Sequence, residues 1–570
     1  WMFGTAVRLF AQRALFSNMS NALPRPSLVF SNITNDLLKE RADFIIDQTK
    51  GLLDAVSAME DSSQNFENTF LKIAHLEGSL SPVESLVDFQ QYVSTDPEIR
   101  KTSSEASSKL QSFGVECSMR RDVYKSLKQV KQEEIDALPA TSQRLVKHAL
   151  RDFERNGLGL PDDQYEQLKA IKQETSALCI KFQQHLNEEN TKVNFSKEEL
   201  KGVPESFFAG REQAEDGKYV VTLKYPDLFP ILNNCEVPAT RRTLYQVNSR
   251  VLVEENIPIL ENVLSLRQKA AKLLGYRSHS DYILETRMAK NLETVSAFLL
   301  NLSTKLEAKA KSEIQVLLDL KIQEAKDLNL VIEEGIQPYD FRYFHEKNLR
   351  DNYKVDHEKI KEYFPVSKVL SGMLDVYQDL FSVKFLQVPE PDVWHPDVQL
   401  YAVFDKDSDD LLGHFYLDLF PREGKFGHAA AFPLQQRYKK EDGTIQHPVA
   451  AMVTNFTKPV GDLPSLLLFS EVETLFHEFG HIMHNICTKS EFARFSGTQV
   501  ERDFVEAPSQ MLENWCYEAS VLQRMSGHYS NLDQWLPDDL LRSLVDAKNC
   551  DSGLLNRRQI FFATYDVTVH

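Results

Sequence analysis

Two histidines in one short segment have the spacing of a metal site. They belong to His477-Glu478-Phe479-Gly480-His481, the one H-E-x-x-H sequence in the chain. Residues four apart on a helix lie one turn apart on the same face. Both imidazoles can therefore bind one ion at the Zn–N distance of about 2.0–2.1 Å. The spacing predicts one zinc ion held by His477 and His481.

Glu478 sits at the position of a catalytic carboxylate in this motif. On a helix it is rotated about 100° from His477, too far around to be the natural third ligand. It is placed instead to reach a water molecule on the ion. Zinc lowers the pKa of such a water to about 7, and Glu478 can then accept its proton as a general base.

The neighbouring residues predict the helix that the motif needs. Ser470 and Glu473 have the spacing of a capping box, so we expect the helix to begin there. Gly480 costs about 1 kcal/mol against alanine inside a helix, which indicates a close backbone approach. The alternative is a helix with two histidines and no metal. The core face of the predicted helix consists of Leu475, Phe479, Ile482 and Ile486.

A third ligand must come from another segment. The downstream carboxylates, among which spacing does not choose, are Glu491, Glu501, Asp503, Glu506 and Glu513. A second helix that carries the ligand is predicted by the apolar residues Phe504, Met511, Leu512 and Trp515. Pro508 fits only its first turn or a kink.

A metzincin would need glycine at 484 and histidine at 487, whereas this chain has His484 and Cys487. We expect His484 to support a ligand or pack beside it. Asp503 either orients a ligand histidine or forms a surface salt bridge.

Two stretches, Phe476–His484 and Phe504–Trp515, closely resemble the thimet oligopeptidase and neurolysin family of zinc endopeptidases. Phe415–His428 and Asn455–Pro459 support the resemblance. It implies that Glu506 is the third zinc ligand beside His477 and His481, with Glu478 as the general base. It also implies a mainly α, two-lobed helical zincin of the gluzincin type. A small β-sheet would lie beside the active site, and a deep channel would admit short unstructured peptides.

The wider sequence agrees with a mainly helical chain. Apolar residues three or four apart predict long helices over 161–186 and 295–322. Strand signals are few: 219–223, a hairpin formed by 401–404 and 414–420, and Val449–Phe456. We expect Val449–Phe456 to be an edge strand that pairs with an extended substrate, the alternative being an interior strand. Its substrate-binding residues would be Ala451, Met452, Val453 and Asn455.

Composition limits the partners. The 570 residues carry a formal net charge of −18, which argues against nucleic acid and favours cationic peptides. No apolar run approaches the roughly 18 residues of a membrane span. The six cysteines include no CxxC pair, so a reducing compartment and a monomer held by its own core are expected.

The two ends of the chain are unusual. Residues 1–24 contain arginines and no acidic residue, as in a mitochondrial transit peptide; the alternative is a disordered leader before a second start at Met19. We therefore expect a cytoplasmic protein, with a mitochondrial location left open.

Residues 25–345 are interpreted as a helical lobe and 346–570 as the catalytic lobe. Family chains continue past His570 into a tyrosine-bearing loop that contacts substrate, and no such loop is present here.

These observations predict a zinc endopeptidase that hydrolyses internal bonds of short peptides. Three alternatives remain. The first is a truncated, catalytically impaired form that binds zinc and peptides. The second is a processing enzyme like the mitochondrial intermediate peptidases, which differ around 504–515. The third is a helical scaffold with an accidental motif.

Overall fold

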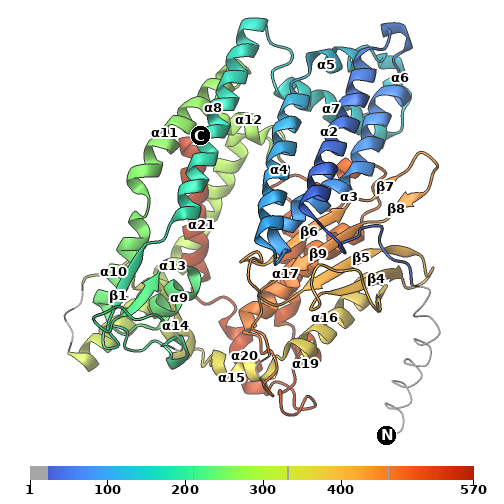
Figure 1. Ribbon diagram of the computed structural model, residues 1–570. Coiled ribbons are helices and arrows are strands. Elements are labelled where there is room, and N and C mark those ends of the chain that lie inside the picture. The colour runs from blue at the N-terminus through green and yellow to red at the C-terminus, as the bar shows by residue number, and fades with distance from the viewer. Residues whose placement is uncertain (1–22, 209–210, 330, 332, 460) are drawn as a thin grey trace, which may run out of the picture. The chain divides into compact units, whose positions relative to one another are not determined.

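The computed structural model describes residues 23–208, 211–329, 331, 333–459 and 461–570 (Figure 1). The expected leader, residues 1–24, lies outside this range except for its last two residues. The described residues are mainly helical and include one five-stranded sheet and two two-stranded sheets, which confirms the mainly α fold class with a small sheet. Among these residues no helix combines the length and apolarity required to cross a membrane.

The chain forms two compact units, each built from two separate stretches. The first unit contains the described residues up to Gly159 together with His357–Leu536, and the second contains Leu160–Asp356 together with Pro537–His570. This division differs from the linear one at residue 345. The reason is packing: Phe89 and Val93 from the N-terminal helices share a buried core with Tyr416 and Val449 of the sheet.

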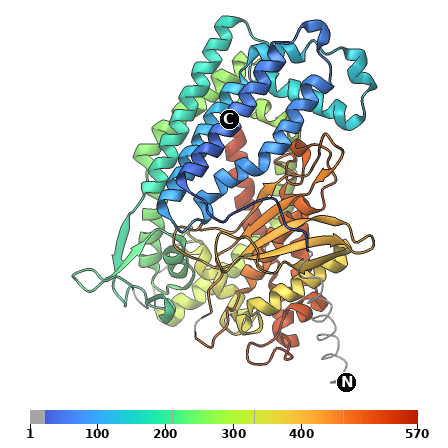
Figure 2. The ribbon, with the colours of Figure 1, turned by 45° about the vertical axis from the view of Figure 1, so that its right-hand side comes forward.

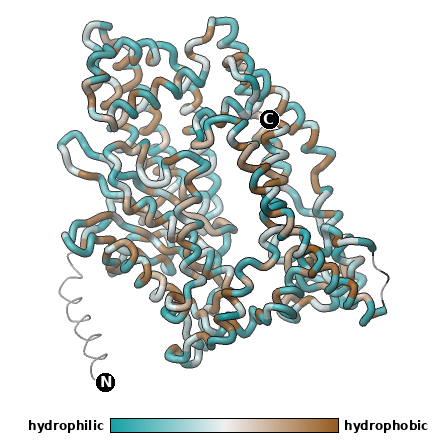
Figure 3. The backbone as a smooth tube through the Cα atoms, turned by 180° about the vertical axis from the view of Figure 1, so that it is seen from behind, coloured by the Kyte–Doolittle hydropathy of each residue, from teal (hydrophilic) through white to brown (hydrophobic). Residues whose placement is uncertain are grey.

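The first unit combines helices from both stretches. Hydrophilic and hydrophobic positions alternate along the chain (Figure 3), as expected for helices that bury one face. The helices of the first stretch are α2 (Asn35–Ser57), α3 (Lys72–Val93), α4 (Pro97–Ser118), α5 (Arg121–Leu127), α6 (Gln132–Ala137) and α7 (Ala140–Arg155). Those of the second stretch are α15 (His357–Ile360), α16 (Val366–Phe381), α17 (Phe469–Ile486), α18 (Glu506–Glu513) and α19 (Ala519–Met525).

The five-stranded sheet has the order β3-β4-β5-β9-β6. Its strands are β3 (Val383–Gln387), β4 (Gln399–Asp405), β5 (Leu411–Asp418), β6 (Ala430–Gln435) and β9 (Val449–Val453). Only the β5–β9 pair is parallel. β4 and β5 form the predicted hairpin, and α3 packs against β6 (Figure 2). β7 (Tyr438–Lys439) and β8 (Ile445–Gln446) form a separate small hairpin.

The prediction that Val449–Phe456 forms an edge strand is wrong. β9 lies between β5 and β6, so its main chain is paired on both sides, and all five of its residues are buried. A continuous apolar run without polar alternation fits a strand covered on both faces, but it does not show which strands pair with its two edges. The free edge on this side of the sheet belongs to β6.

The second unit is helical apart from one short antiparallel pair. β1 (Lys192–Phe195) pairs with β2 (Tyr219–Thr222), close to the predicted strand at 219–223. Two predicted long helices are present as α8 and α13. The helices are α8 (Asp162–Glu188), α9 (Tyr225–Asn234), α10 (Pro238–Arg250), α11 (Val253–Leu273), α12 (His279–Leu284), α13 (Leu292–Leu328), α14 (Phe341–Asp351), α20 (Asp538–Ala547) and α21 (Ser552–Val569).

Candidate metal centre

Helix α17 carries the H-E-x-x-H motif, as predicted, and is held in place by the burial of its apolar face. The four expected core residues Leu475, Phe479, Ile482 and Ile486 are all buried. The cap differs from the prediction. Glu471, and not Glu473, accepts a hydrogen bond of 2.7 Å from the main-chain N–H of Leu468, so the N-cap is Leu468, two residues before Ser470. Glu473 instead accepts from the hydroxyl of Tyr517 at 2.6 Å.

His477, His481 and Glu506 meet at one point. Oε2 of Glu506 lies 3.2 Å from Nε2 of His477 and 3.1 Å from Nε2 of His481. The two rings are nearly perpendicular, with centroids 4.9 Å apart. All three ligand atoms lie within 4.8 Å of one another. Two imidazole nitrogens and one carboxylate oxygen thus converge, although Glu506 is 25 residues beyond His481 in the sequence.

Gly480 allows α18 to approach close enough for this convergence. A Cβ atom at Gly480 would lie 2.9 Å from Cα of Ser509 and 3.3 Å from a methyl group of Leu512. The expectation of close backbone approach is therefore confirmed. Pro508 occupies the first turn of α18, where its missing N–H costs nothing.

Two further side chains of α18 hold the group in place. Oε1 of Glu513 lies 2.7 Å from Nδ1 of His477, on the side of the ring away from Glu506. The Ser509 hydroxyl donates to Glu506, at 3.0 Å from its carbonyl oxygen and 3.2 Å from Oε2. From the sequence, Glu513 is only one of five candidate third ligands, and Ser509 has no predicted role. The seven-residue spacing of Glu506 and Glu513, two helical turns, is the signal that would have placed both carboxylates on one face.

Glu478 is a buried carboxylate beside this cluster. Only 8% of the residue is exposed, and its carboxylate lies near the main chain of Ala431 on β6. Burial raises the pKa of Glu478; the neighbouring His477 partly opposes this, and Glu506 adds to it. Burial also lowers the pKa of His481, which keeps its imidazole neutral and able to bind a cation.

The two residues expected to support the ligands, His484 and Asp503, have different surroundings. His484 packs edge-on against Phe504, and its Nδ1 is buried without a hydrogen-bond partner. This is the packing role that the sequence left open. Asp503 lies in the exposed turn that leads into α18.

The four residues expected to bind substrate are not placed to do so by main-chain pairing. Ala451, Met452 and Val453 are fully buried, with both strand edges paired to β5 and β6. Asn455 instead donates from its amide to the carbonyl oxygens of Phe426 at 2.9 Å and His428 at 3.4 Å. Its visible role is to hold the loop that leads into β6.

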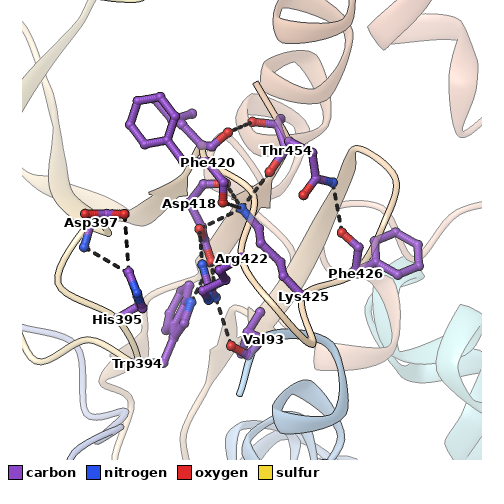
Figure 4. A network of polar contacts seen from close by, with 12 residues as sticks. Val93, Trp394, His395, Asp397, Asp418, Phe420, Arg422, Lys425, Phe426 and Thr454 are labelled. Atoms are coloured by element: carbon purple, nitrogen blue, oxygen red, sulfur yellow. Dashed lines mark hydrogen bonds and ion pairs between the residues drawn. The ribbon is translucent and has the colours of Figure 1, made fainter. Parts of the chain in front are cut away.

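A buried charged network anchors the same loop (Figure 4). Nζ of Lys425 lies 2.8 Å from Oδ1 of Asp418 and 2.6 Å from the carbonyl oxygens of Phe420 and Thr454. Arg422 binds the Asp418 carboxylate through two nitrogens, at 2.7 and 2.8 Å. The side chains of Lys425 and Asp418 are both fully buried. The network ties the ends of β5 and β9 to the segment that delivers β6 beside Glu478.

Comparison with known proteins agrees with this geometry. Residues 231–570 match peptidase family M3, and residues 49–165 match the N-terminal domain of neurolysin and thimet oligopeptidase. The chain belongs to peptidase family M3. The family match confirms the resemblance found in the sequence motifs and includes all of α17 and α18.

Individual relatives are similar along most of the chain. A thimet-like oligopeptidase from Dictyostelium discoideum is 37% identical, over 95% of this chain and 82% of its own length. Saccharolysin from Saccharomyces cerevisiae is 36% identical, over 92% of this chain and 76% of its own length. An oligopeptidase A from Escherichia coli is 32% identical, over 89% of this chain and 76% of its own length.

Proposed function

We propose that this M3-family chain is a zinc-dependent endopeptidase that cleaves internal bonds of short, unstructured peptides. One observation carries the proposal: a single carboxylate oxygen, Oε2 of Glu506, lies within 3.2 Å of the Nε2 atoms of both His477 and His481. These three ligand atoms, from two helices, all lie within 4.8 Å of one another. Relatives named as oligopeptidases support a peptide substrate.

The donor set fits zinc. Two imidazoles with one glutamate are a recurrent ligand set of catalytic zinc, which keeps its fourth position open. The lowered pKa of His481 favours the neutral ring that a metal requires. Glu513 accepts from Nδ1 of His477 and so turns the Nε2 lone pair of that ring toward Glu506. Such a partner on the far nitrogen is typical of a metal-binding histidine.

The chain's own residues then supply proton transfer. When bound, zinc supplies Lewis acidity, which polarises a peptide carbonyl and makes water more acidic. The Glu478 carboxylate takes the proton from the attacking water and delivers it to the leaving amine nitrogen. Its raised pKa helps both steps, because a carboxyl that titrates nearer to neutral pH is a better proton carrier. Burial keeps bulk water away from this carboxylate.

We place the substrate along the free edge of β6, not along β9. β6 is the outermost strand on this side of the sheet, and the main chain of its Ala431 lies near the Glu478 carboxylate, so the free edge of β6 is close to the proposed general base. An extended peptide can add to such an edge through main-chain hydrogen bonds. Pairing of this kind is independent of side chains and permits many sequences, and the net charge of −18 favours cationic ones.

Two variants test the metal centre separately from the chemistry. Glu506→Ala should lower the zinc content by one ion per chain and abolish cleavage of a quenched fluorescent peptide. Glu478→Gln should keep that ion and lower turnover by about 10²–10⁴-fold. Met511→Ala, an exposed side chain on the same helix, is the matched control and should change neither. Unchanged zinc content in Glu506→Ala would refute the ligand assignment, and full turnover in Glu478→Gln would refute the general base.

We further propose that the protein acts as a monomer in the cytoplasm, without nucleic-acid or membrane partners. The acidic composition supports the absence of nucleic acid. One relative carries the name organellar oligopeptidase A, chloroplastic/mitochondrial, so an organelle is the alternative location. Fractionation of cells that express the natural gene, with antibody detection, distinguishes the two.

A further inference from the structure

A second group of metal-binding side chains lies in the second unit, where α14 meets the start of α21. Nδ1 of His345 lies 2.7 Å from Oδ2 of Asp551, and Sγ of Cys550 lies 3.6 Å from the same oxygen. The three ligand atoms all lie within 4.8 Å of one another. Cys550 and Asp551 are buried, and the His345 side chain is 21% exposed. Nitrogen, sulfur and oxygen donors thus converge at a site with access from solvent.

Asp551 stands before α21 without capping it. Its backbone is left-handed, at φ 53°, and its side chain accepts no hydrogen bond from the first turn of the helix. Glu313 of α13 takes that role instead, accepting from the N–H groups of Gly553 at 3.1 Å and Leu554 at 2.9 Å. The Asp551 carboxylate is therefore available to turn toward α14. Asn348, one turn beyond His345, donates to Oδ1 of Asp551 and Sγ of Cys550, each at 3.3 Å.

The surroundings of this group favour a cation. Among the described residues, Asp551 forms an ion pair with His345 and with no lysine or arginine. The carboxylates of Asp551, Glu313 and Glu346 all lie near the Cys550 thiol and surround it with negative charge. A buried carboxylate without a strong cationic partner is costly, and a divalent ion would remove that cost.

We propose that Nδ1 of His345, Sγ of Cys550 and Oδ2 of Asp551 bind a second divalent ion of the zinc class. A tetrahedral zinc ion separates sulfur and oxygen ligands by about 3.5 Å and nitrogen and oxygen ligands by about 3.3 Å. The sulfur–oxygen pair already has this spacing, and the histidine–aspartate pair needs to open by about half an ångström. Mixed nitrogen, sulfur and oxygen donors select zinc over calcium or magnesium.

Binding of the ion is balanced by release of one proton. The thiol proton of Cys550 leaves to solvent as the thiolate binds, and the imidazole carries its single proton on Nε2 once Nδ1 holds the ion. The ion would join α14 to α21 across about 200 residues of sequence. Because such a link forms only in the folded chain, it would raise the stability of the second unit.

Cobalt is the most direct probe, because a Co²⁺–thiolate bond gives an intense near-ultraviolet charge-transfer band. The ligands proposed for the first centre include no cysteine, so this band reports the second centre alone. We expect the metal-free full chain to develop the band with one equivalent of Co²⁺ at this site and to lose it when Zn²⁺ displaces cobalt. Absence of the band in the unaltered chain would overturn the proposal without any variant.

Variants assign the band to these residues. Cys550→Ser should abolish it, whereas Cys235→Ser should keep it, because that buried thiol of the same unit contacts main-chain carbonyls. His345→Gln, which keeps the thiol, should weaken Co²⁺ binding by at least about tenfold and covers the case in which Cys550→Ser fails to fold. An unchanged band in Cys550→Ser, or unchanged affinity in His345→Gln, would overturn the assignment.

The two metal centres can be tested independently. The double variant His477→Ala/His481→Ala removes the imidazoles of the first centre and should leave the thiolate band intact. Zinc content should then fall from two ions per chain to one. Loss of the band in this folded double variant would show that the thiolate signal does not come from the His345–Cys550–Asp551 group, whereas failure of the first proposal alone leaves the band unaffected.

Discussion

Glu513 contacts the far nitrogen of His477: its Oε1 lies 2.7 Å from Nδ1, while Nε2 of the same ring points toward Glu506. Glu506 and Glu513 begin and end the eight-residue helix α18, two turns apart on one face. One short helix therefore supplies both the carboxylate that meets the two Nε2 atoms and the carboxylate that contacts the far nitrogen of His477. The precision of the centre depends on how α18 is held against α17.

Glu513→Ala should weaken zinc binding without removing a ligand. Loss of the partner on Nδ1 frees the tautomer and the rotation of the His477 ring, which typically costs about 10–100-fold in metal affinity. The affinity is measured by competition with a chromogenic chelator. Met511→Ala on the same helix should bind zinc like the unaltered chain. Equal affinities for Glu513→Ala and Met511→Ala would show that the contact has no orienting role.

Gly480→Ala should disturb the candidate metal centre by pushing α18 away from α17. The added Cβ would lie 2.9 Å from Cα of Ser509, so α18 must shift, at a cost of about 1–3 kcal/mol in unfolding free energy. Zinc affinity should fall as well, because Glu506 moves with α18. Gly51→Ala in α2 is the matched control: nothing lies within 4 Å of its Cβ position, so helix propensity should stabilise it by up to about 1 kcal/mol. Urea unfolding of both variants checks the sign, and a stabilised Gly480→Ala would contradict the packing argument.

The parts of the site that depend on local spacing could be predicted from the sequence. The motif helix, its buried face and the close approach at Gly480 all follow from residues within one or two turns. The predicted cap lies two residues too late because Glu471 and Glu473 both follow a plausible start, and only the contact to Leu468 distinguishes them.

The parts that depend on neighbours far along the chain could not be predicted. The edge position predicted for β9 rests chiefly on analogy, since an apolar run is equally compatible with an edge and an interior strand. The pairing with β5 and β6 decides its position. Likewise, α3 joins the core of the sheet through Phe89, which no linear division at residue 345 could anticipate. Long-range packing, not propensity, decides both.

Lys425→Met should destabilise the first unit strongly. The methionine fills similar space but removes the Nζ donor from the Phe420 and Thr454 carbonyl oxygens and takes away one of the two cationic partners of the buried Asp418 carboxylate, the other being Arg422 (Figure 4). Removing one partner of a buried ion pair typically costs about 3–5 kcal/mol. Lys440→Met, at an exposed position in the β7–β8 hairpin, should stay within about 0.5 kcal/mol of the unaltered chain. The comparison uses urea unfolding at neutral pH, and similar losses in both variants would exclude a special role for the network.

Asp418 should make stability fall in acid. Burial alone would raise the pKa of this carboxyl, but hydrogen bonds and charge from Arg422 and Lys425 hold it below its ordinary value. Between that lowered pKa and the ordinary value of about 3.9, the unfolded chain binds more protons than the folded one. The stabilisation is therefore complete above about pH 4 and is lost as pH falls through the folded pKa, by at most about 1.4 kcal/mol per pH unit for one proton.

Asp418→Asn separates this effect from the titration of the other carboxylates. The variant should be less stable at neutral pH, since the amide cannot balance Arg422 and Lys425, and its stability should fall less steeply in acid. Urea unfolding of both chains from about pH 6 to about pH 3 gives the two slopes. Because every other carboxylate is common to both chains, the difference in slope belongs to Asp418. Parallel slopes would mean that Asp418 titrates alike in the folded and unfolded states, and that the network does not hold its charge.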